Sequence, residues 1–175
     1  MHIFLQGIKG VGKSTVIRKT LDIITSRTPL LLGGFFTWKG RKDDLNLYIH
    51  SARRGNESDL FCVAMAGEGK GKYKCGIQVF EREGVRLLDQ SRDADLIIMD
   101  ELGYMESNAP GFRQAVLNII NGSIPVFGVL RLGDVPWHDE IKRNPHVTIY
   151  DVNEENRDNL PRELADILQS AIRNL

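Results

Sequence analysis

The chain has 175 residues, of which 42% are hydrophobic and 26% are charged, and its 23 basic residues balance its 23 acidic residues. This length suits a single domain (residues 1–175), the zero net charge gives no global basic footprint for nucleic acid, and no apolar run approaches the roughly 18 residues of a membrane span. Because the sequence begins directly in an apolar stretch with no room for a signal peptide, we expect a soluble, cytoplasmic and monomeric protein.

A glycine-rich segment follows the first predicted strand (2–6) and precedes a predicted helix (13–27). The pattern G-x-x-x-x-G-K-[ST] is matched at every fixed position by Gly7-Ile8-Lys9-Gly10-Val11-Gly12-Lys13-Ser14. In this pattern the glycines let backbone N–H groups turn toward an anion, the lysine reaches the β- and γ-phosphates, and the serine hydroxyl serves Mg²⁺. With Thr15 the segment is a predicted nucleotide-binding loop; the alternative is a glycine-rich turn that merely opens the helix.

The composition changes after residues 29–37, which we interpret as a strand entering a glycine turn. From 38 to 80 there is no helical period, and three short stretches alternate or run apolar between turn-forming segments. We expect two or three antiparallel strands here, and these stretches are 45–51, 60–66 and 77–80. The turn at Lys70–Lys74 has two interpretations, a solvated hairpin loop, which such charge runs usually form, and a mobile lid over a triphosphate.

The second decisive segment follows a predicted helix (81–92). The apolar run 96–99 suits a strand buried on both faces of a parallel sheet, and Asp100 and Glu101 stand at its C-terminal end, where such sheets bind ligands. In phosphate-loop enzymes an acid at this place holds Mg²⁺ together with the loop serine. Glu101 is then placed to orient and deprotonate an attacking water. Two charges ending a strand in solvent are the alternative, and for Glu106 capping, pairing and assisting roles all stay open.

The remaining segments continue the α/β pattern. A helix that Pro110 opens is followed by a buried strand (124–130), a short helix (137–143), a strand (147–152) and a C-terminal helix. Arg131, directly after the buried strand, has two interpretations, a cis arginine finger that points at the γ-phosphate and a surface salt bridge. We predict an α/β P-loop NTPase domain with a mostly parallel central sheet, flanking helices and an inserted antiparallel segment at about 38–80.

Several of these segments together resemble a known family. They are the phosphate loop, Gly34-Phe35-Phe36-Thr37, Asp100-Glu101-Leu102-Gly103-Tyr104-Met105-Glu106, and the closing segment 152–160 with its Glu155-Asn156-Arg157. In this the chain is similar to the small nucleoside-triphosphatases of thermophilic microbes and animals, called cancer-related nucleoside-triphosphatase in animals. The resemblance implies the catalytic-glutamate class of P-loop enzymes, which hydrolyse several nucleoside triphosphates with Mg²⁺ and no strong base preference. By position, residues 7–14 would bind phosphate, Ser14 and Asp100 the metal, and Glu101 would activate water.

One departure from this family pattern concerns the segment after Thr37. Many members have an acidic residue and then arginine there, whereas this chain has Trp38-Lys39-Gly40-Arg41.

Three functions compete on the sequence alone. The leading hypothesis is Mg²⁺-dependent hydrolysis of ATP, GTP and other nucleoside triphosphates, with Lys13 and the loop N–H groups stabilising the γ-phosphate charge. A small-molecule or nucleotide kinase would place its acceptor pocket in the inserted strands. Glu101 argues weakly against this hypothesis, because a residue that activates water would make a kinase hydrolyse ATP without phosphorylating an acceptor. A nucleotide-dependent switch with slow hydrolysis would use Arg53-Arg54 and the Lys70–Lys74 turn for a protein or nucleic-acid partner. No motif fixes the preferred base or the physiological substrate.

Overall fold

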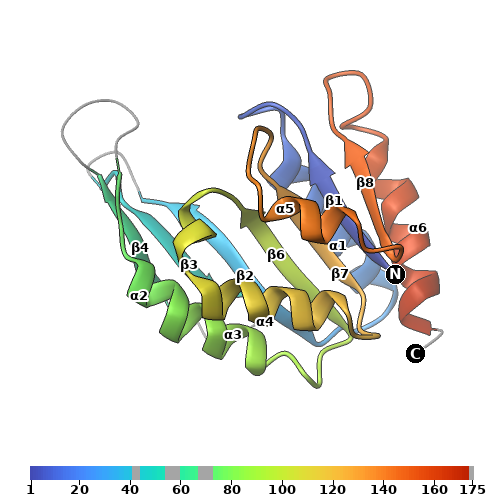
Figure 1. The fold of residues 1–175 in the computed structure, drawn as a ribbon. Coiled ribbons are helices and arrows are strands. Elements are labelled where there is room, and N and C mark those ends of the chain that lie inside the picture. Colours follow the sequence, from blue (N-terminus) through green and yellow to red (C-terminus); the bar gives the residue numbers. More distant parts are fainter. Residues whose placement is uncertain (41–43, 54–59, 67–72, 174–175) are drawn as a thin grey trace.

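The strands form one sheet in the computed structural model, which describes residues 1–40, 44–53, 60–66 and 73–173 (Figure 1). In chain order they are β1 His2–Gln6, β2 Leu32–Lys39, β3 Leu47–Ser51, β4 Leu60–Ala66, β5 Tyr73–Cys75, β6 Leu96–Leu102, β7 Val126–Leu130 and β8 Val147–Asp151. Within these residues the sheet has eight strands in the order β5-β4-β3-β2-β6-β7-β1-β8. Strands β2, β6, β7, β1 and β8 pair in parallel, and β3, β4 and β5 extend one edge in antiparallel fashion. The predicted mostly parallel sheet is confirmed.

Helices cover both faces of this sheet (Figure 1). The longer ones are α1 Lys13–Arg27, α4 Pro110–Ile120 and α6 Leu160–Arg173, and the shorter ones are α2 Ile77–Val79, α3 Val85–Asp89 and α5 His138–Lys142. A π-helical segment, η1 (Phe80–Gly84), joins α2 to α3, and a 3-10 turn, η2 (Met105–Asn108), follows β6. None of the described helices has the length and apolar content of a membrane span.

Each face of the sheet has its own hydrophobic core because alternate residues of a strand point to opposite faces. Met99 of β6 lies in the same buried cluster as Phe112 of α4, whereas its neighbour Ile98 lies with Ile17 of α1 and Leu164 of α6. All of these side chains are at most 1% exposed. The run 96–99 is therefore buried on both sides, as its sequence predicts, and it brings Asp100 to the carboxyl edge of the sheet.

Gly33 and Gly34 lie inside β2, so the predicted glycine turn is wrong although the strand is right. Strand β2 runs close beside β6, and a Cβ on Gly34, whose φ is 82°, would collide with the carbonyl oxygen of Ile98. On Gly33 a Cβ would lie 2.5 Å from the Cβ of Ser91. The Ser91 hydroxyl also accepts a hydrogen bond from the Gly34 N–H at 2.6 Å. The glycines permit close packing rather than a reversal of the chain.

Residues 77–80 form the start of a helix, and the strand predicted there is wrong. The N–H of Gly76 donates to the carbonyl of Val63 at 2.7 Å, and helical structure begins at the next residue. Phe80 turns into the core, where its ring lies 5.4 Å from that of Phe112. Alternation of apolar and polar residues over only four positions cannot distinguish a strand from the first turn of a helix, because both place apolar side chains a few residues apart.

Candidate functional site

The glycine-rich loop joins β1 to α1 at the carboxyl edge of the sheet. Gly12, with φ 112°, is the N-cap of α1, and no described side chain caps the first turn of this helix. A left-handed conformation at this position favours glycine, and the N–H groups of an uncapped first turn are donors for an anion. The local geometry is therefore that of a phosphate-binding loop.

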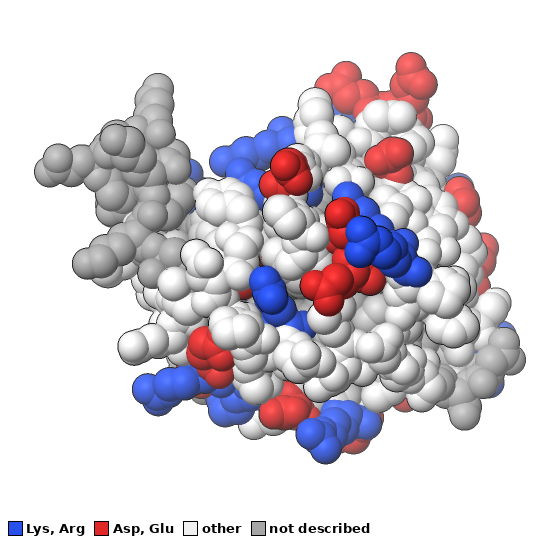
Figure 2. Space-filling view, viewed as in Figure 1, with Lys and Arg blue, Asp and Glu red and all other residues white. Residues whose placement is uncertain are grey.

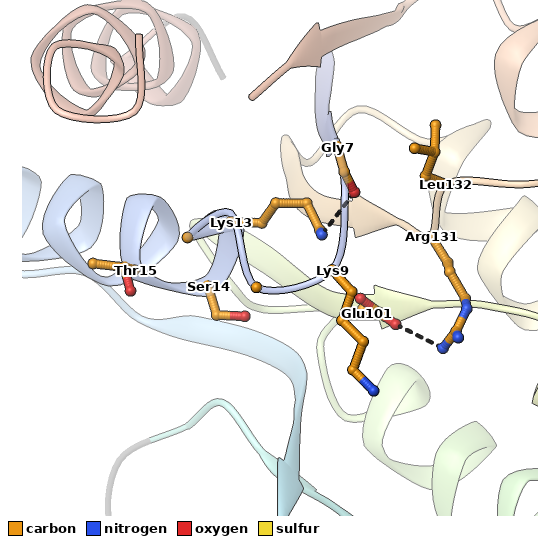
Figure 3. Close-up of a pocket in the computed structure, with 10 residues that line it drawn as sticks. Gly7, Lys9, Lys13, Ser14, Thr15, Glu101, Arg131 and Leu132 are labelled. Carbon is orange, nitrogen blue, oxygen red and sulfur yellow. Dashed lines mark hydrogen bonds and ion pairs between the residues drawn. The ribbon is translucent and has the colours of Figure 1, made fainter. Parts of the chain in front are cut away.

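Lys13 lies across the mouth of this loop with only 8% of its surface exposed. Its ammonium donates to the carbonyl oxygens of Gly7 at 2.9 Å and Ile8 at 3.1 Å, the first of which Figure 3 shows. These oxygens are uncharged, so the lysine retains a full positive charge above the loop. This arrangement suits an anion bound between the ammonium and the backbone N–H groups.

Ser14 and Asp100 meet beside the loop. Burial of Asp100, which is 4% exposed, raises its pKa to about 6, while a hydrogen bond with Ser14 and the charges of Lys13 and Arg18 act in the opposite direction. A hydroxyl and a carboxylate are the oxygen ligands that Mg²⁺ accepts in proteins. The described residues contain no cluster of three or more His, Cys, Asp or Glu that could hold a metal. A cation at Ser14 and Asp100 would therefore take its other ligands from phosphate and water.

Glu101 and Arg131 close the other side of the site. The Arg131 guanidinium lies 3.5 Å from a Glu101 carboxylate oxygen (Figure 3). It also lies over the Tyr104 ring, 4.7 Å from the ring centre. Both side chains are only partly exposed, at 37% for Arg131 and 34% for Glu101. The salt-bridge interpretation of Arg131 is thus correct, and its partner is the predicted general base. Strand β7 separates β6 from β1, so Glu101 faces the loop across one strand, whereas Arg131 directly follows β7, the strand next to β1.

These groups surround a pocket of about 380 Å³. It is lined by Gly7, Lys9, Gly10, Gly12, Lys13, Ser14, Thr15, Glu101, Arg131 and Leu132. Nearly all the residues predicted from the sequence therefore come together. Three predicted residues do not line it: the side chain of Ile8 is exposed, that of Val11 is buried in the core with α1, and Asp100 lines an adjoining cavity. Leu132 is the one lining residue that the sequence did not suggest.

Glu106 supports the turn that carries the end of β6. Its carboxylate accepts a hydrogen bond from the Gly103 N–H at 2.9 Å, and the Trp137 indole donates to the Gly103 carbonyl at 2.9 Å. Burial raises the pKa of Glu106 to about 7, with Glu101 adding to the shift and the Gly103 N–H opposing it. Among the roles left open for Glu106, the structure shows capping of this turn. Trp137 was missed because nothing in its sequence neighbourhood points to Gly103.

Arg157 is a further residue beside the loop that sequence patterns did not assign. Its guanidinium donates to the carbonyl of Val11 at 3.3 Å, and its side chain lies within 3.7 Å of a Cβ placed on Gly12. The Glu155-Asn156-Arg157 segment supplied the only sequence signal for it.

The features suggested for a macromolecular partner are only partly described. Lys70 and Lys72 of the Lys70–Lys74 turn and Arg54 lie outside the described residues, whereas Lys74 lies in β5 and is paired with Met65 of β4. Arg53 is engaged within the chain, with Asp93 at 2.5 Å and the Gln90 carbonyl at 3.1 Å. Basic and acidic side chains are interspersed over the face drawn in Figure 2, so its described residues form no continuous basic surface for nucleic acid.

A parallel sheet with helices on both faces, a glycine-rich loop between β1 and α1, and an acidic pair at the end of β6 together define a P-loop NTPase. Comparison with known proteins gives the family. A family model described as NTPase matches residues 2–165, and the chain therefore belongs to that family.

Individual relatives and solved structures agree. The chain is 31% identical over 169 residues to the nucleoside-triphosphatase THEP1 of Methanosarcina barkeri, with 95% of this chain and 96% of the relative covered. It is 28% identical to the cancer-related nucleoside-triphosphatase homolog of Bos taurus, with 97% of each covered. The crystal structure of THEP1 from Aquifex aeolicus superposes with a TM-score of 0.77 at 27% identity, covering 96% of this chain and 99% of that one.

Proposed function

We propose that this protein is an Mg²⁺-dependent enzyme that hydrolyses nucleoside triphosphates to the diphosphate and phosphate. The observation that carries the proposal is the position of Glu101, a carboxylate in the wall of the same pocket as Lys13 and the loop glycines. A triphosphate bound by the loop would present its γ-phosphate to this wall. The family of the chain and the names of its relatives support the same activity.

The chemistry follows from the charges around the pocket. Lys13 and the loop N–H groups stabilise the negative charge on the γ-phosphate in the transition state. Glu101 orients a water molecule and accepts its proton while the water oxygen bonds to the γ-phosphorus and the bond to the β–γ bridging oxygen breaks. Arg131 holds the Glu101 carboxylate by the ion pair at 3.5 Å and adds positive charge to the same wall.

Ser14 and Asp100 are the residues that would hold Mg²⁺ in this proposal. When bound, the ion neutralises charge on the β- and γ-phosphates. The buried Asp100 carboxylate lies within hydrogen-bonding reach of the Ser14 hydroxyl, so one ion could contact both groups.

We also infer a broad base specificity, because the pocket is lined by loop residues and by side chains at the γ-phosphate end, none of which reads a base. A monomeric state and a cytoplasmic location remain predictions from the sequence.

The test is phosphate release from ATP, GTP, CTP and UTP with Mg²⁺ and no acceptor. Removal of a general base costs roughly a hundredfold or more, so we expect Glu101→Gln to lower kcat by at least that factor while nucleotide affinity stays within about threefold of wild type. Glu163→Gln, an exposed substitution on α6, is the matched control and should behave as wild type. Equal rates for Glu101→Gln and wild type would refute the assignment.

A further inference from the structure

A second chamber adjoins the phosphate pocket. Its volume is about 380 Å³, and it shares Lys9, Ser14, Glu101 and Arg131 with the phosphate pocket. The two cavities thus meet at the proposed general base. A molecule in the second chamber would lie against Glu101, next to the place of the γ-phosphate.

The walls of this chamber come largely from the inserted antiparallel strands and their surroundings. Trp38 is at the end of β2, Leu47 begins β3 and Val63 lies in β4. Phe80, the first residue of η1, also lines the chamber. Asp100 and the buried carboxyl of Glu106 also line it. Ser14 and Asp100 in this lining would serve Mg²⁺, and hydrolysis needs one water molecule at Glu101, so the proposed hydrolysis leaves the part of the chamber lined by Trp38, Leu47 and Tyr104 without a role.

The lining indicates the kind of molecule that would fit. Trp38 and Tyr104 are large aromatic side chains that are 40% and 47% exposed, and the partly buried Leu47 is a further apolar residue of the lining. Nucleobases of every kind stack on such side chains, because each base has a π-face. The volume is at the lower end of the range for small-ligand pockets, about 300–1,000 Å³. These features suit one planar ring system with a sugar-sized polar group.

We propose that this chamber is an acceptor site for an aromatic alcohol of nucleoside size, to which the protein transfers the γ-phosphoryl group. The proposal rests on the proposed nucleotide site, since the donor must bind in the phosphate pocket. The ring would lie against Trp38 and Tyr104, and the hydroxyl would lie at Glu101 in place of water.

The transfer is balanced without a further reactant. The hydroxyl oxygen of the acceptor bonds to the γ-phosphorus, and the bond from that phosphorus to the β–γ bridging oxygen breaks. The bond electrons leave with the nucleoside diphosphate, and the hydroxyl proton passes to the Glu101 carboxylate. The same base thus serves water when the chamber holds water and an alcohol when the chamber holds an acceptor.

The experiment uses the full chain with γ-³²P-labelled ATP, Mg²⁺ and millimolar adenosine, guanosine, cytidine or thymidine. Labelled nucleoside phosphate and labelled inorganic phosphate are separated and counted. We expect labelled nucleoside phosphate with at least one nucleoside. Trp38→Ala should lower the ratio of transfer to hydrolysis at least about fivefold, because it removes a stacking surface, whereas Trp38→Phe should retain the ratio within about threefold.

The outcomes separate this inference from the proposed function. Release of inorganic phosphate without a labelled nucleoside from any of the four overturns the acceptor site and leaves the hydrolase standing. An equal transfer ratio in Trp38→Ala and wild type also overturns it. If neither product forms in wild type, the hydrolase proposal fails with it. Inorganic phosphate release by each variant reports that its nucleotide site has folded.

Discussion

At the scale of single residues, Arg131 has two partners, the Glu101 carboxylate at 3.5 Å and the Tyr104 ring at 4.7 Å. An arginine that contacts the γ-phosphate in P-loop enzymes contributes about 10³ to 10⁵ in kcat. Because Arg131 is partly exposed and already paired, we expect a smaller loss, roughly a hundredfold to a thousandfold in kcat, for Arg131→Ala, with KM little changed. Arg131→Lys should retain only part of the wild-type kcat, since a lysine ammonium lacks the planar, forked array of N–H donors of a guanidinium.

Steady-state phosphate release measures this effect. Arg143→Lys and Arg143→Ala are matched controls, because Arg143 is exposed and pairs only with Asp139 on α5 among the salt bridges of the described residues. A kcat for Arg131→Ala within about threefold of wild type would show that Arg131 pairs with Glu101 but does not contribute to catalysis.

Glu106 gives a prediction about pH. Its carboxyl titrates at about 7 in the folded chain against an ordinary 4.5, because burial penalises the charged form. Its contribution to stability is therefore fully present below pH 4.5 and is lost as pH rises through 7. Between pH 5 and 8 we expect this group to lower the unfolding free energy by roughly 2–3 kcal/mol. Glu106→Gln keeps an oxygen acceptor for Gly103 and should lose this part of the pH dependence.

Urea denaturation of wild type and Glu106→Gln at pH 5 and pH 8 measures the difference. Glu163→Gln, whose side chain is exposed, should keep the pH dependence of wild type. If Glu106→Gln showed the same change between the two pH values as wild type, the carboxyl would not titrate in the folded chain as proposed.

Sequence patterns located the residues of the phosphate pocket but not those that support it. Lys13, Ser14 and Glu101 belong to short patterns whose spacing follows from the chemistry of phosphate and metal. Trp38 and Trp137 belong to none, and Arg157 belongs to the family segment Glu155-Asn156-Arg157, which assigned it no role. They reach the site through contacts between segments distant in the chain, such as the bond from Trp137 to Gly103, and no local spacing reports such contacts.

At the scale of elements, β2 shows how a glycine pair can be misinterpreted. Glycine is typical of turns, yet in β2 it serves the close approach of β6 and Ser91. A Cβ at Gly34 would collide with the Ile98 carbonyl at a φ of 82°. We expect Gly34→Ala to lower the unfolding free energy by roughly 2–6 kcal/mol, from backbone strain together with overpacking.

Gly133→Ala is the matched control for Gly34→Ala. Gly133 also has a positive φ, 128°, but a Cβ there would meet nothing within 4 Å. It should therefore show only the strain, roughly 1–3 kcal/mol. Chemical denaturation of both variants at one pH measures the difference, and equal losses would show that the approach of β6 does not require Gly34.

At the scale of the whole molecule, the parallel core was predictable because apolar runs mark its central strands β1, β6 and β7. The inserted segment was harder, since its strands are short and the helix at Ile77 begins with the same alternation. Its function could not be predicted at all, because the second chamber exists only where β2, β3, β4 and Phe80 converge on Glu101. The phosphate site at this edge of the sheet is thus recognisable from short sequence segments, whereas the chamber beside it is formed by residues that only the fold brings together.

Binding of nucleotide should stabilise the whole fold through this edge, because Lys13 links the first turn of α1 to the loop carbonyls after β1. At a hundredfold excess over Kd a ligand adds about 2.7 kcal/mol to the unfolding free energy, which for a domain of this size corresponds to a rise in Tm of roughly 5–11 °C. A non-hydrolysable ATP analogue with Mg²⁺ should give this shift in wild type and in Lys19→Ala, whose exposed lysine on α1 pairs with Asp158. In Lys13→Ala the shift at the same ligand concentration should fall below about 2 °C, because the ammonium that faces the phosphates is gone. A full shift in Lys13→Ala would mean that the nucleotide binds elsewhere on the molecule.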